Sequence, residues 1–186
     1  VFMRIVLGMT GASGSIFGVE FLRRATGEEV YLVLSRWGRS VLHQETGLTA
    51  ENLSTFSKKV FSNEDMNAPI ASGSNPVDAV VILPCSMATL GKIAHGIGDN
   101  LITRTAEVAL KERRKLLLCL RETPLSTIDL ENAHKLSLAG AIIMPVSPPF
   151  YQKPASLPDL INGYVDKIRG VLGLPVEAGW RSRDLD

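Results

Sequence analysis

The chain has 186 residues, of which 45% are hydrophobic and 21% are charged, and its 20 basic and 19 acidic side chains leave a formal net charge of +1. This length can bury a full hydrophobic core, so we expect one domain over residues 1–186, with 173–186 forming a C-terminal tail. The near balance of charge argues against a nucleic-acid or membrane-surface partner, and no apolar run is long enough to span a membrane.

Apolar runs of strand length alternate along the chain with segments of helical period. In chain order, we expect a strand over 3–9, a helix over 15–25, a strand over 29–35, a helix over 37–46, a strand over 78–84, a helix ending near 94, a helix over 100–113, a strand over 115–120, a helix over 126–138, a strand over 140–145 and a closing helix over 156–172. Ser156 and Asp159 are spaced as a capping box for that last helix. The longest polar stretch, 62–76, is predicted to be a loop.

The alternation of strands and helices predicts βαβ units. Such units form a parallel sheet with helices on both faces, and the consecutive apolar residues of the strands fit strands that are buried on both sides. We therefore predict a three-layer α/β fold. Ligands of open parallel sheets bind outside the carboxyl ends of the strands, so the loops of interest are 10–14, 35–37, 84–89, 121–126 and 145–153.

Two of these loops have the composition of phosphate-binding loops. Thr10-Gly11-Ala12-Ser13-Gly14 joins a strand to a helix, where free backbone N–H groups attract an anion, although a tight turn capped by Ser13 is an equally good interpretation. In the loop 84–89, Ser86 and Thr89 can either cap the next helix or help to cradle a phosphate. The presence of both loops in one sheet favours a phosphate-bearing ligand, although the GxGxxG dinucleotide spacing is absent.

Other polar groups have ordinary structural explanations. Taken alone, Ala71-Ser72-Gly73-Ser74 is best interpreted as a mobile linker, and the helix stripe that carries Arg104 and Lys111 as a solvated face. Arg121 and Glu122 follow a strand, where a structural ion pair and a ligand-binding pair are about equally expected.

The histidines and cysteines show no metal-binding or disulfide pattern. His43, His95 and His134 are scattered, so we predict no metal site. Cys85 and Cys119 lie far apart and form no CxxC motif, which is typical of a reduced, cytoplasmic setting. We interpret Cys85 as a buried structural thiol rather than as a nucleophile.

Several short segments occur in the order that is found in one protein family. They are TGASG after the first strand, ASGS near the middle, PCSMAT after the third strand, ALKERR, RETPLSTIDLEN and FYQKP. Together they make the chain, from about Arg4 to Trp180, resemble the UbiX flavin prenyltransferases. The resemblance implies a Rossmann-like or flavodoxin-like fold that binds FMN.

The same resemblance implies a reaction and partners. The family transfers a dimethylallyl group from dimethylallyl monophosphate to N5 and C6 of reduced FMN, which adds a fourth ring to the flavin. The reaction needs no metal, and the product, prenylated FMN, serves a partner decarboxylase of the UbiD type. The resemblance further implies a homo-oligomer, a dodecamer, whose sites are shared between subunits.

The resemblance also assigns roles to individual residues of this chain. The flavin-binding positions are Gly11, Ala12, Ser13, Ser35, Ser86, Met87, Ala88, Thr89 and Arg121. The positions that bind the prenyl phosphate are Tyr151, Lys167, Arg104 and Lys111, and the positions implied in catalysis are Glu122, Glu45, Ser13, Lys111, Arg104 and Ser72. Cleavage of an allylic C–O bond leaves a carbocation and a phosphate dianion, so cationic side chains suit the phosphate and Glu122 suits proton transfer.

Two other functions are compatible with the same loops. One is an FMN-dependent cysteine decarboxylase, although PCSMAT replaces the PASANT-type segment of those enzymes and His43 has no equivalent motif. The other is a non-catalytic FMN carrier, which would have no use for a second phosphate site. The chain departs from many members of the resembled family at Met66-Asn67, where they carry a tryptophan.

Overall fold

A six-stranded sheet organises the structure, a computed structural model that describes residues 2–176. The strands are β1 Arg4–Met9, β2 Glu29–Leu34, β3 Lys59–Ser62, β4 Ala79–Cys85, β5 Lys115–Leu120 and β6 Ile142–Ile143. They lie in the order β3-β2-β1-β4-β5-β6, and every pairing is parallel. The prediction of an α/β, Rossmann-like fold with a parallel sheet is therefore confirmed.

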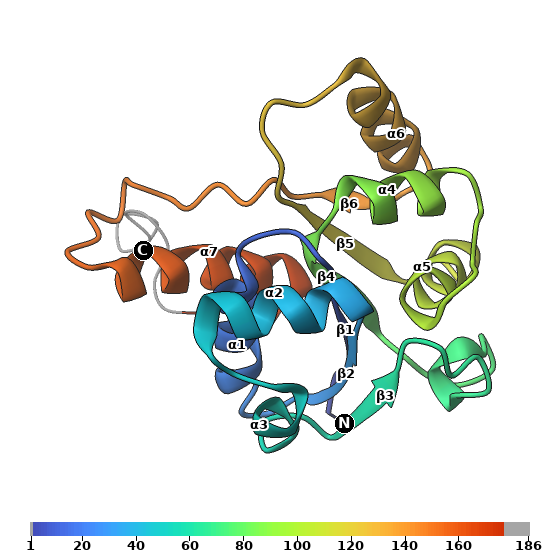
Figure 1. The fold of residues 1–186 in the computed structure, drawn as a ribbon, viewed down its shortest axis with the longest axis horizontal. Coiled ribbons are helices and arrows are strands. Elements are labelled where there is room, and N and C mark those ends of the chain that lie inside the picture. The colour runs from blue at the N-terminus through green and yellow to red at the C-terminus, as the bar shows by residue number, and fades with distance from the viewer. Residues whose placement is uncertain (1, 177–186) are drawn as a thin grey trace, which may run out of the picture.

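Helices cover both faces of this sheet. They are α1 Ser15–Arg23, α2 Arg36–Thr46, α3 Ala50–Ser54, α4 Met87–Ala94, α5 Leu101–Lys111, α6 Thr127–Leu138 and α7 Leu157–Leu172, with a short 3-10 helix at Pro69–Ala71. Figure 1 shows α1, α2, α3 and α7 on one side of the strands and α4, α5 and α6 on the other. Each face of the sheet therefore packs its own hydrophobic core.

The central strand β4 contributes to both cores. All seven of its residues are buried. Val81 and Leu83 pack into the core on the α1 and α7 side, whereas Val80 and Ile82 pack into the core on the α5 side. A strand that is covered on both faces needs apolar residues at consecutive positions, which is why its sequence showed no alternation.

The segment 47–76 contains elements that hydrophobic periodicity does not predict. The edge strand β3 has only one buried residue, Phe61, so it lacks the apolar run of an interior strand. The interpretation of 71–74 as a mobile linker is wrong, because Ala71 packs into the α5-side core. The Arg114 guanidinium also donates hydrogen bonds to the carbonyls of Gly73 (2.6 Å) and Asn75 (3.0 Å).

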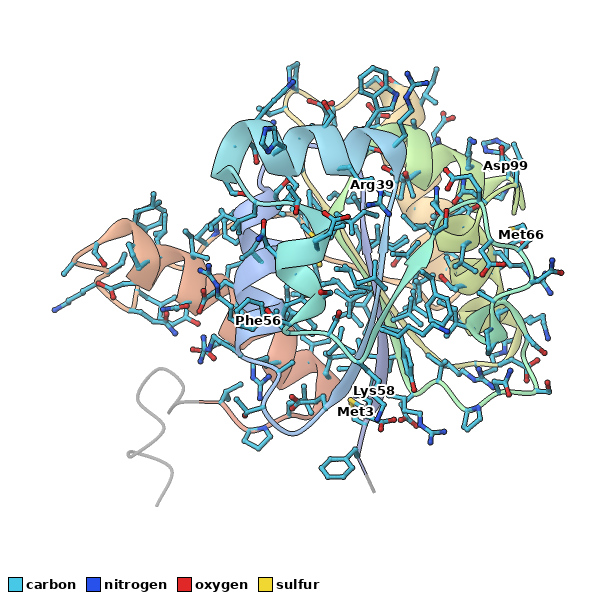
Figure 2. All side chains as sticks on the ribbon, turned by 60° about the horizontal axis from the view of Figure 1, so that its bottom comes forward. Met3, Arg39, Phe56, Lys58, Met66 and Asp99 are labelled. Atoms are coloured by element: carbon cyan, nitrogen blue, oxygen red, sulfur yellow. The ribbon has the colours of Figure 1, made fainter. Side chains whose placement is uncertain are left out.

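The polar loop around Met66 lies along the same edge of the molecule as the start of α5. Figure 2 shows Met66 and Asp99 at this edge. The carbonyl of Asn63 accepts a hydrogen bond from the N–H of Leu101 at 2.8 Å, and its side-chain oxygen accepts one from Ile102 at 3.0 Å. Asn63 thereby ties the segment after β3 to the first turn of α5.

The closing segments differ from their predicted bounds in small ways. Only Ile142–Ile143 of the predicted strand 140–145 is regular, although the N–H of Met144 still donates to the Leu118 carbonyl at 2.9 Å. The Ser156 hydroxyl caps α7 as predicted, since it accepts from the N–H of Asp159 at 3.3 Å. The Asp159 carboxylate, however, accepts from the N–H of Ala155 and not from that of Ser156, so the capping box is incomplete.

The helix α7 ends at Gly173, which has a φ of 86° and adopts the left-handed conformation that favours glycine at helix ends. The predicted tail, 173–186, continues into residues 177–186, and these lie outside the described residues, as does Trp180. Within residues 2–176, no helix combines the length and the apolar character that crossing a membrane requires.

The strand order creates a switch point between β1 and β4. From β1, the chain adds β2 and β3 toward one edge of the sheet. It then returns to place β4 next to β1 on the opposite side, toward the other edge. The loops after β1 and β4 consequently start helices on opposite faces, α1 and α4. In open parallel sheets, this geometry leaves a crevice for ligands at the carboxyl ends of the strands.

Candidate active site

The loop after β1 presents consecutive backbone amides. Within the described residues, no hydrogen bond involves the N–H groups of Gly11, Ala12 and Ser13. Gly11 packs directly against α2, because a Cβ atom at this position would lie 2.5 Å from the Cβ of Trp37. Glycine thus lets the loop approach α2 closely while its amides remain able to bind an anion.

The amino end of α1 already holds a negative charge. The Glu45 carboxylate, from α2, accepts hydrogen bonds from the N–H groups of Gly14 (2.9 Å) and Ser15 (2.9 Å). The side chain of Arg121 lies above this point, with its Cγ 3.9 Å from where a Cβ on Gly14 would be. The anion at the helix start is therefore a side chain, and the amides at 11–13 are the ones left for a ligand.

The environment of Glu45 favours its charged form. Burial raises the pKa of this carboxyl group, but hydrogen bonds from the Ser13 hydroxyl and from the N–H groups of Gly14 and Ser15 lower it more, with help from the Arg121 guanidinium. The net effect holds the pKa of Glu45 below its ordinary value.

We expect the stabilisation from Glu45 to disappear as the pH falls. A carboxyl group with a lowered folded-state pKa contributes fully above its unfolded pKa of about 4.3, and it loses that contribution as the pH falls through the folded pKa. Glu45→Gln should lower the Tm at neutral pH by about 2–4 °C, or ~1 kcal/mol. Melting curves recorded from neutral pH to about pH 3 should converge for the two proteins. A Tm difference that stays constant over this range would contradict the assignment.

The loop after β4 combines a helix cap with free amides. The Ser86 hydroxyl accepts from the N–H of Thr89 at 3.3 Å and lies 3.0 Å from the Thr89 hydroxyl, so Ser86 caps α4. Within residues 2–176, no hydrogen bond involves the N–H groups of Met87 and Ala88, which belong to the first turn and have no intrahelical acceptor. The capping and phosphate-cradle interpretations are therefore compatible here.

Ser35 has a similar position after β2. Its hydroxyl accepts from the N–H of Gly38 at 2.9 Å and caps α2, and its own N–H donates to the carbonyl of Met9 at 3.0 Å. These bonds hold the amino end of α2 against the carboxyl end of β1. The hydroxyl proton of Ser35 stays available to donate to a ligand.

Arg121 and Glu122 follow β5 at the same edge of the sheet. The N–H of Arg121 donates to the Cys85 carbonyl at 3.3 Å, which joins the ends of β5 and β4. The Glu122 carboxylate accepts from the N–H of Thr123 at 3.0 Å, and both side chains are exposed. The two residues do not pair with each other, so the alternative of a structural ion pair is wrong within the described part of the chain.

Ser72, Arg104 and Lys111 lie together on the other side of the sheet, beside α5. The Arg104 guanidinium donates to the Ala71 carbonyl at 3.2 Å, and the Lys111 ammonium forms an ion pair with Glu112. In residues 2–176, no hydrogen bond or ion pair joins this group to Glu45, Arg121 or Glu122.

Tyr151 and Lys167 belong to the last two segments of the described fold. Tyr151 is in the connection between β6 and α7, which Figure 1 shows extending away from the sheet before α7 returns. This connection packs on α7 at Gly163, where a Cβ atom would lie 3.1 Å from the ring of Pro149. Both Tyr151 and Lys167 are exposed. Within the described residues, no hydrogen bond or ion pair joins Tyr151 or Lys167 to the other expected site residues.

Two residues near the switch point escaped the sequence prediction. Trp37 is 67% exposed yet lies against Gly11, at the entrance to the candidate flavin loop. Thr10 is buried and bonds to the loop after β4. An aromatic residue at a helix start and a hydroxyl at the last position before a loop are the signals that could have identified them.

In the described residues, no three histidine, cysteine, aspartate or glutamate side chains come together as a metal would require.

Comparison with known proteins identifies the family. Residues 2–172 match the family model described as Flavoprotein. A flavin prenyltransferase UbiX from Thermoplasma acidophilum is 45% identical over 172 residues, which are 92% of this chain and 96% of that protein. The chain belongs to the UbiX family of flavin prenyltransferases. The function inferred from the short motifs is thereby confirmed at the level of the family.

Solved structures of UbiX-like proteins agree in fold. AnUbiX (PadA1), crystallised with FMN and dimethylallyl pyrophosphate, has a TM-score of 0.91 and 40% identity, and the match covers 97% of this chain and all of that one. A dodecameric FMN-dependent UbiX-like decarboxylase from Escherichia coli O157:H7 has a TM-score of 0.91 and 38% identity over 96% of this chain and 99% of its own.

The cysteine decarboxylase alternative receives no comparable support. The peptidyl-cysteine decarboxylase EpiD has 19% identity and a TM-score of 0.63 over 80% of this chain and 89% of its own. A likeness at this level shows a shared fold and not a shared reaction.

Proposed function

We propose that this chain binds FMN at the carboxyl ends of β1, β2 and β4, and that it transfers to it a dimethylallyl group from dimethylallyl monophosphate. Reduced FMN supplies the nucleophilic N5 and C6 atoms for this reaction. The observation that carries the proposal is that two adjoining loops at one switch point have amides without partners in the described residues, at 11–13 and at Met87 and Ala88, in a UbiX-family chain.

The residues around the switch point suit a flavin phosphate. Backbone amides from two loops and the Ser35 hydroxyl can donate to the phosphate oxygens, and Arg121 adds a positive charge at the same edge. Ser13 and Glu45 lie beside this loop as a hydrogen-bonded pair. We assign them to hydrogen bonding around the bound FMN.

A neighbouring copy of the chain would complete the prenyl-phosphate site. Within the described residues, Arg104 and Lys111 lie beside α5 and form no hydrogen bond or ion pair with Glu122, and a similar protein from Escherichia coli is dodecameric. We propose the same assembly here. When the allylic C–O bond breaks, the phosphate leaves with the electron pair, and cationic side chains stabilise its charge.

Glu122 is the proposed proton donor. The Glu122 carboxyl group would protonate the oxygen of the departing phosphate, or it would accept the proton that leaves C6. Ser72 is proposed as a hydrogen-bonding residue near the phosphate. Exposure of Glu122 in one chain is consistent with a site that a second subunit closes.

Lys111→Ala should weaken binding of the prenyl phosphate without affecting FMN. Removal of one charge-assisted hydrogen bond costs about 1.5–3 kcal/mol, so the KM for dimethylallyl monophosphate should rise roughly 10- to 100-fold. Steady-state kinetics and FMN titration measure the two effects separately. Lys92→Ala is the matched control, because Lys92 is also an exposed lysine paired with a carboxylate, Asp99. Equal loss of both ligands in Lys111→Ala would indicate a structural role instead.

Mixed assemblies can test the shared site. At dimethylallyl monophosphate concentrations well below the raised KM, subunits with Lys111→Ala and subunits with Glu122→Gln should each show low activity alone. Their mixtures should regain part of the activity, since one interface type would carry both native residues. Activity that stays at the level of the separate variants would place both residues in the same subunit's site.

The product would serve a partner decarboxylase of the UbiD type. We further propose a cytoplasmic protein, which is supported by Cys85 and Cys119, both of them free and buried thiols. Burial raises the pKa of Cys119 to about 12 and also raises that of Cys85, so neither thiol is suited to act as a nucleophile.

Anaerobic incubation with reduced FMN and dimethylallyl monophosphate tests the proposal. Mass analysis of the extracted flavin should show the gain of one dimethylallyl unit. Recovery of unmodified flavin from protein that binds FMN tightly would instead favour a carrier or a decarboxylase.

A further inference from the structure

The ends of β1 and β4 are held together by a side chain after their regular pairing stops. Register between the two strands runs from Ile5↔Ala79 to Gly8↔Ile82 and no further. On its other side, β4 also shifts register against β5 between Ile82 and Cys85. The switch point therefore lies where the backbone ladder has become irregular.

Thr10 bridges this irregular region. Its hydroxyl donates to the Pro84 carbonyl at 2.7 Å and accepts from the N–H of Ser86 at 2.9 Å. Its own N–H also donates to the Pro84 carbonyl at 3.2 Å. Thr10 is only 2% exposed, and its hydroxyl adds hydrogen bonds between the two strand ends beyond their regular pairing.

This bridge determines where the two loops lie relative to each other. Thr10 immediately precedes the free amides at 11–13, and Ser86 immediately precedes those of Met87 and Ala88. One hydroxyl thus connects the residue that begins one loop to the residue that caps the helix after the other. Amides that bind one phosphate must keep a fixed separation, because a misplacement of about 1 Å is enough to lose much of the benefit of preorganised groups.

We propose that Thr10 is a positioning residue for the FMN phosphate, which acts through the backbone of the two loops and does not touch the ligand. The proposal rests on the proposed function for the location of FMN. Its physical basis is the cost of leaving the half-buried Ser86 N–H without its acceptor and of removing the shorter of the two hydrogen bonds to the Pro84 carbonyl.

Thr10→Val tests this role, because valine keeps the shape of threonine and lacks the hydroxyl. We expect binding of oxidised FMN, measured by fluorescence titration well below the Tm, to weaken about tenfold or more. Thr10→Ser keeps the hydroxyl and should stay within about threefold of the original affinity.

Thr105→Val is the matched control. Thr105 is also 2% exposed, and its hydroxyl donates to the Ile102 carbonyl at 2.8 Å within α5, away from both loops. A merely structural role for Thr10 predicts that both valine variants lower the Tm alike and that neither changes FMN affinity beyond the other. FMN affinity in Thr10→Val within about twofold of that in Thr105→Val would overturn the proposal.

Hydrogen exchange gives a measurement that does not depend on Thr10→Val folding. In the unaltered protein without FMN, the amide of Ser86 should exchange slowly, which mass spectrometry of a peptide that begins upstream of Leu83 and extends through Ser86 can detect. Thr10→Ser should preserve this protection. Rapid exchange at Ser86 in the unaltered protein would also overturn the proposal. None of these readouts requires prenyl transfer, so failure of the anaerobic assay would refute the proposed reaction alone.

Discussion

Glu122→Gln should leave FMN binding unchanged and lower the rate of prenylated-flavin formation by at least about a hundredfold, the usual lower range for loss of a general acid or base. Glutamine keeps the size of the side chain, and its amide oxygen can still accept the hydrogen bond from Thr123. What it lacks is an exchangeable acidic proton. Anaerobic turnover with mass detection of the flavin, together with FMN titration, measures both quantities.

The control for this variant is Glu131→Gln. Glu131 is an exposed carboxylate on α6, close in sequence to Glu122, and it forms no ion pair within the described residues. Its replacement changes the net charge by the same amount and should leave turnover unaffected. Unchanged turnover in Glu122→Gln would remove Glu122 from the mechanism, whereas parallel loss of FMN would make it a residue of the flavin site.

Arg169→Met should destabilise the folded chain by about 3–5 kcal/mol, because it leaves a buried carboxylate without its partner. The Arg169 guanidinium lies 3.3 Å from the Glu28 carboxylate, with the two side chains only 8% and 5% exposed. It also donates to the Arg24 carbonyl at 2.9 Å. Thermal unfolding should show a Tm lower by roughly 10 °C or more.

A comparison with Lys92→Met separates the effect of burial on stability from the effect of a short distance between the two charges. The Lys92 ammonium is 2.7 Å from the Asp99 carboxylate, closer than in the buried pair, but both side chains are well exposed. Its loss should cost under about 1 kcal/mol. Replacing Glu28 by Gln in the Arg169→Met background should recover part of the stability, since no buried charge then remains. Equal Tm losses in Arg169→Met and Lys92→Met would refute the argument from desolvation.

The parts of the fold that were predicted correctly depend on local signals. The strands β1, β2, β4 and β5 were visible as apolar runs because they are covered on both faces. Helix starts such as Ser156 were visible because capping involves residues three positions apart. The edge strand β3 was missed, since it is four residues long and has only two apolar residues, which carry no such signal.

The candidate site was predictable in its composition and not in its arrangement. The carboxyl-end rule and the ordered motifs selected the loops at 10–14 and 84–89. They did not indicate that Glu45 would occupy the amino end of α1, because that contact joins residues about 30 positions apart across two βαβ units. Nor did they show that Arg104 and Lys111 would lie on the opposite side of the sheet from Glu45.

By itself, the sequence determined the α/β class, most of the strands and helices, the loops that bear the site and the family. These follow from hydrophobic periodicity, capping spacings and short ordered motifs, all of which act between residues close along the chain. Only the tertiary structure decided which N–H groups remain free, which anion caps α1 and how Thr10 joins the two loops. The contacts of Glu45 and Thr10 join residues about 30 or more positions apart. The crossover connections between parallel strands bring such residues together.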